Sequence, residues 1–210
     1  MSDDPKRIVA SGYDSIAERY AEWAASFESP QMRWLERLFA KLEDGSQVLE
    51  LGCGGGGPMT LVLAGRHRLL GVDISPRQIE RARARVPGAT FRCADATQLE
   101  LEPDSFDAVV SLFMLGHVPR AEQAPLLAAI ASWLRPGGWL LATMGTAGAE
   151  DEVEDDWLGA PMFFASFDEE TNRQLLSDAG FELVEARTIP IEEPGHGLTS
   201  FMYVLGRLVG

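Results

Sequence analysis

The feature that most constrains this chain is a glycine-rich stretch that directly follows a short apolar run. Five of the six residues from Gly52 to Gly57 are glycines, and the apolar run from Val48 to Leu51 precedes them. Glycine loses more conformational entropy on folding than other residues, so such a run is typical of a loop that must turn sharply. A loop without side chains also lets a ligand approach the backbone. The pattern therefore predicts a strand, a ligand-binding turn and the start of a helix.

Short apolar runs alternate with helical patterns from residue 47 onward. The runs that predict strands cover 47–51, 68–72, 89–94, 106–112 and 139–143, and the helical patterns between them cover 59–64, 76–85 and 121–134. Strands that alternate with helices favour a parallel sheet with helices on both faces. We therefore expect an α/β fold with a doubly wound, mostly parallel sheet.

Three carboxylates lie where they suit a nucleoside ligand. A G-x-G-x-x-G pattern begins at Gly52, and Asp73 follows about 20 residues later, where its carboxylate can bind ribose hydroxyls. Asp95 ends the third strand and can accept a hydrogen bond from an exocyclic amine such as that of adenine. Glu50 disfavours a pyrophosphate beside the loop because like charges repel, and it suits a cofactor with a cationic end. The carboxyl ends of parallel strands share one edge, so the three acids predict one crevice.

Charge and cysteine content restrict the partners. The chain has 18 Lys and Arg against 32 Asp and Glu, a net charge of −14, which disfavours nucleic acid and anionic membranes. No apolar run approaches the ~18 residues of a membrane-spanning helix, and the first residues lack an export signal. Cys53 and Cys93 do not have metal-ligand spacing, and Cys93 is expected in the core. We expect a cytoplasmic protein without a metal, a nucleic-acid partner or a membrane partner.

Five motifs occur in a fixed order along the chain. They are VLELGCGGGG at 48–57, GVDIS at 71–75, CADA at 93–96, FDAVVSLFMLGHVP at 106–119 and WLRPGGWLLATM at 133–144. Together they resemble the motifs of the class I S-adenosylmethionine-dependent methyltransferases. The segment YDSIAERY at 13–20 is similar to the N-terminal element of the small-molecule branch, where it folds over the cofactor. The resemblance implies a Rossmann-like, seven-stranded sheet with an antiparallel final strand, and S-adenosyl-L-methionine as cofactor.

The resemblance also implies roles for individual residues. Asp73 would hold the ribose, Asp95 and Ala96 would meet the adenine edge, and Tyr20 would close over the cofactor. The predicted cofactor-binding residues are Tyr20, Glu50, Gly52, Cys53, Gly54, Asp73, Ile74, Gln78, Asp95, Ala96, Leu112 and Phe113. A nucleophilic role for Cys53 is not expected, because nothing near it in sequence lowers its pKa.

Candidate catalytic and substrate residues follow from the chemistry. Methyl transfer needs a base only where the acceptor must lose a proton, and His117 and His196 are the candidate bases, each with a structural alternative. His67 is expected at the surface. The predicted substrate contacts are Tyr13, Trp157, Met162, Phe163 and Phe164, for which plain packing is the alternative. The expected partner is a small-molecule methyl acceptor, bound by a monomer or homodimer.

The length of the chain predicts one domain. We expect residues 1–44 to form a helical cap and residues 45–144 to form the cofactor-binding core. Residues 145–167 are expected to form a lid insertion, and residues 168–210 a C-terminal helix and strands. The lid is set apart by six acidic residues from Glu150 to Asp156, followed by aromatic residues. Such a charge run can attract a cationic amine or simply be solvated.

Two further functions fit part of the pattern. A nicotinamide-dependent oxidoreductase would use the glycine pattern and Asp73, but Glu50 and the motif around Asp95 disfavour it. A cofactor-binding module without transferase activity would share the cofactor residues and lack a pocket beside the methyl group. The leading hypothesis is methyl transfer to an oxygen or nitrogen of a small molecule by in-line displacement.

Overall fold

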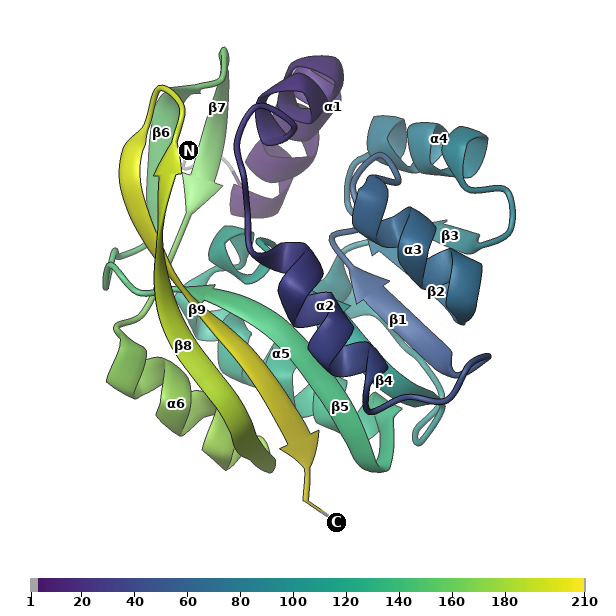
Figure 1. The fold of residues 1–210 in the computed structure, drawn as a ribbon. Helices are drawn as coiled ribbons and strands as arrows, with labels where there is room; N and C mark the ends of the chain where they lie inside the picture. Colours follow the sequence, from purple (N-terminus) through teal and green to yellow (C-terminus); the bar gives the residue numbers. More distant parts are fainter. Residues whose placement is uncertain (1–3, 210) are drawn as a thin grey trace.

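The computed structural model describes residues 4–209, so residues 1–3 of the predicted cap and residue 210 of the C-terminal segment lie outside the described residues. The central strands are β1 (Gln47–Leu51), β2 (Arg68–Asp73), β3 (Thr90–Cys93), β4 (Phe106–Ser111), β5 (Leu134–Gly145), β8 (Phe181–Glu193) and β9 (Gly197–Leu208). They form one seven-stranded sheet in the order β3-β2-β1-β4-β5-β9-β8 (Figure 1). Pairs from β3 to β5 are parallel, and β9 is antiparallel to β5 and β8. The predicted α/β fold, including its antiparallel final strand, is confirmed.

Helices cover both faces of the sheet. One face carries α2 (Gln31–Phe39), α3 (Pro58–Arg66) and α4 (Pro76–Arg85), and the other carries α5 (Arg120–Trp133) and α6 (Glu169–Asp178) (Figure 1). Val48 belongs to the same core cluster as Leu38 of α2, whereas its neighbour Leu49 belongs to the cluster that includes Ile130 of α5. Successive residues of β1 therefore face opposite helix layers, as the period of two in a strand requires.

The remaining long helix, α1 (Pro5–Ala24), packs on a two-stranded hairpin rather than on the sheet (Figure 1). The hairpin consists of β6 (Glu152–Trp157) and β7 (Ala160–Phe164) and lies within the predicted lid insertion. Ile16 of α1 is buried together with Met162 and Phe163 of β7. The four acidic residues between positions 152 and 156 are exposed. The hairpin is thus attached to α1 by its apolar residues, and its motion as a lid stays a prediction.

The close approach of α1 to β7 gives the first testable prediction. A Cβ added at Gly12 would lie 2.8 Å from Met162 Cε and 2.8 Å from the Pro161 carbonyl oxygen. Because a backbone atom cannot move aside freely, we expect Gly12→Ala to lower the free energy of unfolding by about 1–3 kcal/mol. Gly65 in α3 is the matched control, since a Cβ there meets nothing within 4 Å.

Gly65→Ala is expected to raise the free energy of unfolding by about 0.5–1 kcal/mol, because alanine loses less entropy in a helix than glycine. Urea denaturation of the two variants measures both effects. A Gly12→Ala protein as stable as Gly65→Ala would contradict the close packing of α1.

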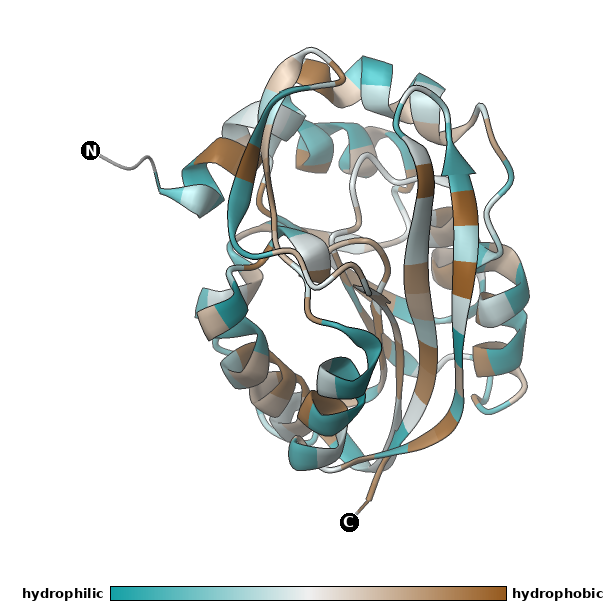
Figure 2. Ribbon diagram, turned by 90° about the vertical axis from the view of Figure 1, so that its left-hand side faces the viewer, coloured by the Kyte–Doolittle hydropathy of each residue, from teal (hydrophilic) through white to brown (hydrophobic). Residues whose placement is uncertain are grey.

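The last two strands are longer than the sequence pattern predicts. The prolines and glycines between Pro190 and Gly197 predict a ligand-facing turn there, with strands over 181–189 and 200–208 on either side. In the structure, β8 and β9 leave only residues 194–196 between them. Hydrophilic and hydrophobic residues alternate along β8, as in a strand with one face in solvent (Figure 2). Within residues 4–209, no helix has the length and apolar character needed to cross a membrane.

Candidate functional site

The glycine-rich loop turns sharply between β1 and α3. Gly52, Gly54 and Gly56 have φ angles of +74°, +53° and +70°, a region that residues with side chains rarely adopt. The Gly52 N–H donates to the Val72 carbonyl oxygen at 2.8 Å and so fixes the loop to β2. A Cβ added at Gly54 would meet no atom within 4 Å. The loop therefore presents bare backbone to open space at the carboxyl edge of the sheet.

Asp73, at the end of β2, holds this loop in place. Its Oδ2 accepts a hydrogen bond from the Gly54 N–H at 2.9 Å, and its Oδ1 accepts one from the Ser75 N–H at 2.9 Å. Burial raises the pKa of Asp73 to about 6, although these two hydrogen bonds act in the opposite direction. One carboxylate thus orders both the glycine loop and the start of α4.

Glu50, at the end of β1, is a buried carboxyl group with one unpartnered oxygen. Its Oε1 accepts from Thr60 Oγ1 at 3.0 Å, whereas Oε2 has no hydrogen-bond partner among the described residues. Burial raises the pKa of Glu50 to about 8, against the lowering effect of Thr60 and with a smaller contribution from Asp73. A buried carboxylate is costly unless a cation or donor pairs with it. The unpartnered oxygen therefore fits a ligand with an ammonium group.

The raised pKa of Glu50 predicts that the free energy of unfolding of the ligand-free protein depends on pH. The usual pKa of glutamate is about 4.3, so between about pH 4.3 and 8 the folded protein keeps a proton that the unfolded chain releases. The contribution of Glu50 to the free energy of unfolding is then fully present below about pH 4.3, falls as pH rises from about 4.3 to 8, and is level above pH 8. Since glutamine stays neutral, we expect Glu50→Gln to be more stable than the wild type at pH 8.5, by more than at pH 5.

Urea denaturation at both pH values measures this difference. The control is Glu192→Gln, which removes an exposed carboxylate from β8 and should show no such trend. An unchanging difference between Glu50→Gln and the wild type would show that Glu50 ionises normally.

These residues border two adjoining cavities. The smaller, of about 90 Å³, lies around Asp73, Ile74 and Asp95, and the larger, of about 820 Å³, extends from Glu50 to the β6–β7 hairpin. Tyr20 and Phe113 line both cavities. All twelve residues predicted to bind the cofactor line one or both. The structure thus brings the predicted residues together, while their contacts with a cofactor stay predictions.

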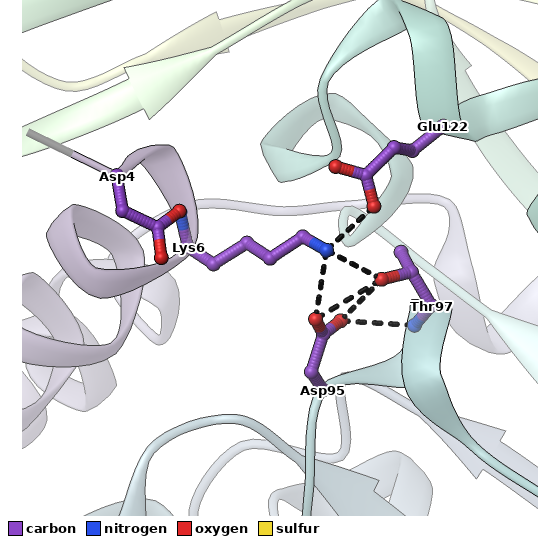
Figure 3. A network of polar contacts seen from close by, with 5 residues as sticks. All are labelled: Asp4, Lys6, Asp95, Thr97 and Glu122. Carbon is purple, nitrogen blue, oxygen red and sulfur yellow. Dashed lines mark hydrogen bonds and ion pairs between the residues drawn. The ribbon is translucent and has the colours of Figure 1, made fainter. Parts of the chain in front are cut away.

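A polar network centred on Lys6 borders the smaller cavity, which is lined by Lys6, Asp95 and Thr97 (Figure 3). Lys6 Nζ lies 2.9 Å from Asp95 Oδ2, 2.5 Å from Glu122 Oε2 and 2.7 Å from Thr97 Oγ1. Burial lowers the pKa of Lys6, but hydrogen bonds and charge from Glu122 and Asp95 outweigh it and raise the pKa overall. Asp95 also accepts from the Thr97 N–H at 2.9 Å. Lys6 therefore holds the first turn of α1 against the predicted adenine end of the site.

His117 forms a hydrogen-bonded pair with Tyr13 at the wall shared by the two cavities. His117 Nδ1 lies 2.9 Å from the Phe163 carbonyl oxygen, which can only accept, so Nδ1 carries the proton. Burial lowers the pKa of His117, against a raising effect of this hydrogen bond, so the ring is neutral near pH 7. Nε2 is then an acceptor, and the Tyr13 hydroxyl donates to it at 2.8 Å. A neutral imidazole nitrogen beside a cavity can take a proton.

The other predicted catalytic and substrate residues divide into two groups. Trp157, Phe164 and His196 line the larger cavity. Met162 and Phe163 are not in the lining, because they are buried between the hairpin and α1. Their side chains therefore fit the packing alternative, and Phe163 meets the site through its carbonyl oxygen.

Several residues of the site gave little signal in the sequence. Phe113 has a φ of +58°, and its N–H donates to Thr143 Oγ1 at 2.6 Å, so Thr143 fixes a strained turn after β4. Thr143 could have been found, since it lies near the carboxyl end of β5. Trp23 and Glu193 line the larger cavity from segments distant in sequence, and only the tertiary fold shows that they meet.

Two predictions outside the site are wrong. His67 is buried, with its ring centroid 5.3 Å from that of Phe39, rather than at the surface. Cys93 is exposed rather than in the core, because β3 is one of the two edge strands of the seven-stranded sheet. Burial raises the pKa of the Cys53 thiol, which opposes nucleophilic reactivity. In the described part of the chain, no group of three or more His, Cys, Asp or Glu could hold a metal ion.

Comparison with known sequences identifies the family. Residues 48–138 match the model of a family described as a methyltransferase domain. The chain is 31% identical over 181 residues to 27-O-demethylrifamycin SV methyltransferase of Amycolatopsis mediterranei, across 73% of this chain and 66% of that protein. It is 30% identical over 183 residues to a probable S-adenosylmethionine-dependent methyltransferase of Mycolicibacterium smegmatis, across 86% and 70%. The chain spans about half to two thirds of the length of the first curated relatives that it matches.

Solved structures show the same fold. A 1,6-didemethyltoxoflavin-N1-methyltransferase of Burkholderia thailandensis, with bound 1,6-didemethyltoxoflavin and S-adenosylhomocysteine, superposes with a TM-score of 0.74 at 21% identity, across 97% of this chain and 88% of that one. The family itself is shown by the relative from Mycolicibacterium smegmatis, which is matched over more than two thirds of its length. The chain therefore belongs to the class I S-adenosylmethionine-dependent methyltransferases, the family that its five motifs predicted.

Proposed function

We propose that this protein transfers a methyl group from S-adenosylmethionine to an oxygen or nitrogen atom of a small molecule. The observation that carries the proposal is the unpartnered Oε2 of buried Glu50 beside the bare backbone of Gly54. A cofactor with an ammonium group would pair with this oxygen, and Asp73 would hold its ribose. The single Thr97 hydroxyl proton can go to Asp95 Oδ1, at 2.9 Å, rather than to Oδ2, at 3.0 Å. Asp95 Oδ2 would then accept from the adenine amine while it keeps Lys6, since one carboxylate oxygen accepts about two hydrogen bonds.

The cofactor would supply an electrophilic methyl group on a sulfonium. The protein would orient the acceptor toward this methyl group, exclude water from the cavity and accept a proton. The larger cavity adjoins the cofactor-binding residues and is lined by Tyr13, Trp157 and Phe164, which would exclude water and orient the acceptor. This cavity favours an enzyme over a module that only binds the cofactor.

His117 is the proposed destination of the acceptor's proton. The acceptor lone pair forms the new bond to the methyl carbon, and the electrons of the broken bond stay on sulfur. An acceptor that starts as a neutral O–H or N–H must also lose its proton, and Nε2 of His117 would take it directly or through the Tyr13 hydroxyl. The carbonyl oxygen of Phe163 holds the ring in the tautomer that this step requires.

Two measurements test the proposal. Calorimetry should show that S-adenosylhomocysteine binds the protein and that NAD does not. Transfer of radiolabelled methyl from S-adenosylmethionine to a panel of small amines, phenols and carboxylic acids should then identify acceptors. A protein that does not bind S-adenosylhomocysteine would overturn the proposal. A protein that binds it but methylates no member of a broad panel would favour the binding-module alternative.

A further inference from the structure

One wall of the larger cavity is aromatic. This aromatic wall consists of Tyr20 and Trp23 on α1 and Trp157 on β6, and all three residues line the cavity. Their ring centroids are 5.7 Å apart for Trp23 and Trp157, 5.9 Å for Tyr20 and Trp157, and 6.0 Å for Tyr20 and Trp23. Trp23 Nε1 donates to the Pro194 carbonyl oxygen at 2.9 Å, which holds α1 against the β8–β9 turn. The wall is therefore built by two separate parts of the chain and held against a third, the β8–β9 turn.

Carboxylates surround the aromatic wall. Glu152 and Glu154 lie two residues apart on β6 and both line the cavity, whereas the exposed Val153 between them does not. Glu193, at the end of β8, is half-buried and accepts a long hydrogen bond of 3.4 Å from Thr199 Oγ1. Glu193 lines the same cavity as Glu152 and Glu154.

The positive charges around this cavity are few. Arg85 at the end of α4 is the one lysine or arginine among the described residues of the lining. His196 lies beside the wall, with its ring centroid 6.0 Å from that of Trp23, and its Nδ1 is 3.7 Å from Glu154 Oε1. The larger cavity thus combines the aromatic wall with three acidic side chains, Glu152, Glu154 and Glu193. A fourth, Glu50, lies at the end of the cavity where the cofactor is predicted to bind.

We propose that the aromatic wall and Glu152, Glu154 and Glu193 bind a cationic amine on the acceptor molecule, an inference that rests on the proposed function. Aromatic rings attract cations through their negative faces, and the half-buried Glu193 carboxylate gains when a cation replaces its lost hydration. The exposed Glu152 and Glu154 add negative charge to the same cavity. The same charges disfavour an anionic substrate such as a carboxylic acid or a phosphate. An ammonium nitrogen has no lone pair, so this group serves recognition, and a second atom of the same molecule accepts the methyl group.

A pair of probes with the same shape and different charge tests the inference. Choline and its uncharged isostere 3,3-dimethylbutan-1-ol are titrated separately into the wild-type protein, with tryptophan fluorescence as the signal. We expect choline to bind at least tenfold more tightly. Glu193→Gln should lower the affinity for choline about tenfold and leave that for the alcohol unchanged.

The control is Glu192→Gln, which removes the same charge from the exposed neighbouring residue of β8 and should alter neither affinity. Trp23→Leu should also weaken choline binding. If that variant does not fold, the comparison of Glu193→Gln with Glu192→Gln still shows whether the Glu193 carboxylate contributes to choline binding. Equal affinities for the two probes, or binding of neither, would overturn the inference.

Titration of the same samples with S-adenosylhomocysteine separates this inference from the proposed function. Cofactor binding without a preference for choline refutes the cation site alone. A preference for choline without cofactor binding refutes the methyltransferase proposal and supports the cation site.

Discussion

Asp73→Asn is expected to weaken the binding of S-adenosylhomocysteine about 1,000-fold. The carboxylate accepts from the Gly54 and Ser75 N–H groups with different oxygens, whereas an asparagine side chain offers one oxygen and one N–H₂ group. One of the two backbone donors would then face another donor. Hydrogen bonds to a charged group contribute about 1.5–3 kcal/mol each, so losing one to the loop and one to the ribose accounts for a change of this size.

Isothermal titration calorimetry measures this loss, and circular dichroism checks that the variant is folded. The matched control is Asp44→Asn, which neutralises an exposed aspartate before β1, where the strand begins rather than ends. Its affinity should stay within about twofold of the wild type, since exposed ion pairs contribute little. An Asp73→Asn protein that binds within tenfold of the wild type would show that Asp73 does not organise the cofactor loop.

The fold was predictable because its signals are local. The glycine run, the apolar strands and the helical patterns each fix one element, and the parallel arrangement then places Glu50, Asp73 and Asp95 at one edge of the sheet. The antiparallel final strand came from the family resemblance rather than from spacing. The length of β8 and β9 was underestimated because Pro190 and Pro194 suggest a loop, yet Pro190 lies in the edge strand β8, which tolerates a missing donor.

The site was predictable only where it follows the strands. The cofactor residues lie on the strand ends and the loops after them, so a motif locates them. The larger cavity beside them is lined by α1, the β6–β7 hairpin and the β8–β9 turn, which are far apart in the sequence. No local pattern in the sequence therefore predicts that Trp23 contacts Pro194 or that Lys6 contacts Asp95. The acidic run from Glu150 to Asp156 left a solvated loop and a cation-attracting surface open. Glu152 and Glu154 lie on β6 and line the larger cavity, which supports a cation-attracting surface for these two residues.

His117→Asn is expected to lower kcat about 100-fold for an acceptor that must lose a proton, with KM for S-adenosylmethionine nearly unchanged. Asparagine can keep a donor to the Phe163 carbonyl oxygen in place of Nδ1–H, so the hairpin keeps its attachment while the basic Nε2 is lost. Because burial lowers the pKa of His117 below its usual 6.5, the wild-type rate should rise with pH to a midpoint below 6.5 and stay level above it. The variant should lack this midpoint.

The pH profile separates a base from a merely structural histidine. If His117 only holds the hairpin, the activity of His117→Asn should keep the wild-type pH midpoint. Tyr13→Phe tests the route of the proton, since it removes the hydroxyl that donates to Nε2 and keeps the aromatic ring. A loss as large as that of His117→Asn would indicate that the proton passes through Tyr13. A rate close to the wild type would indicate that the acceptor takes the place of the Tyr13 hydroxyl at Nε2, because the freed nitrogen can then accept its proton directly.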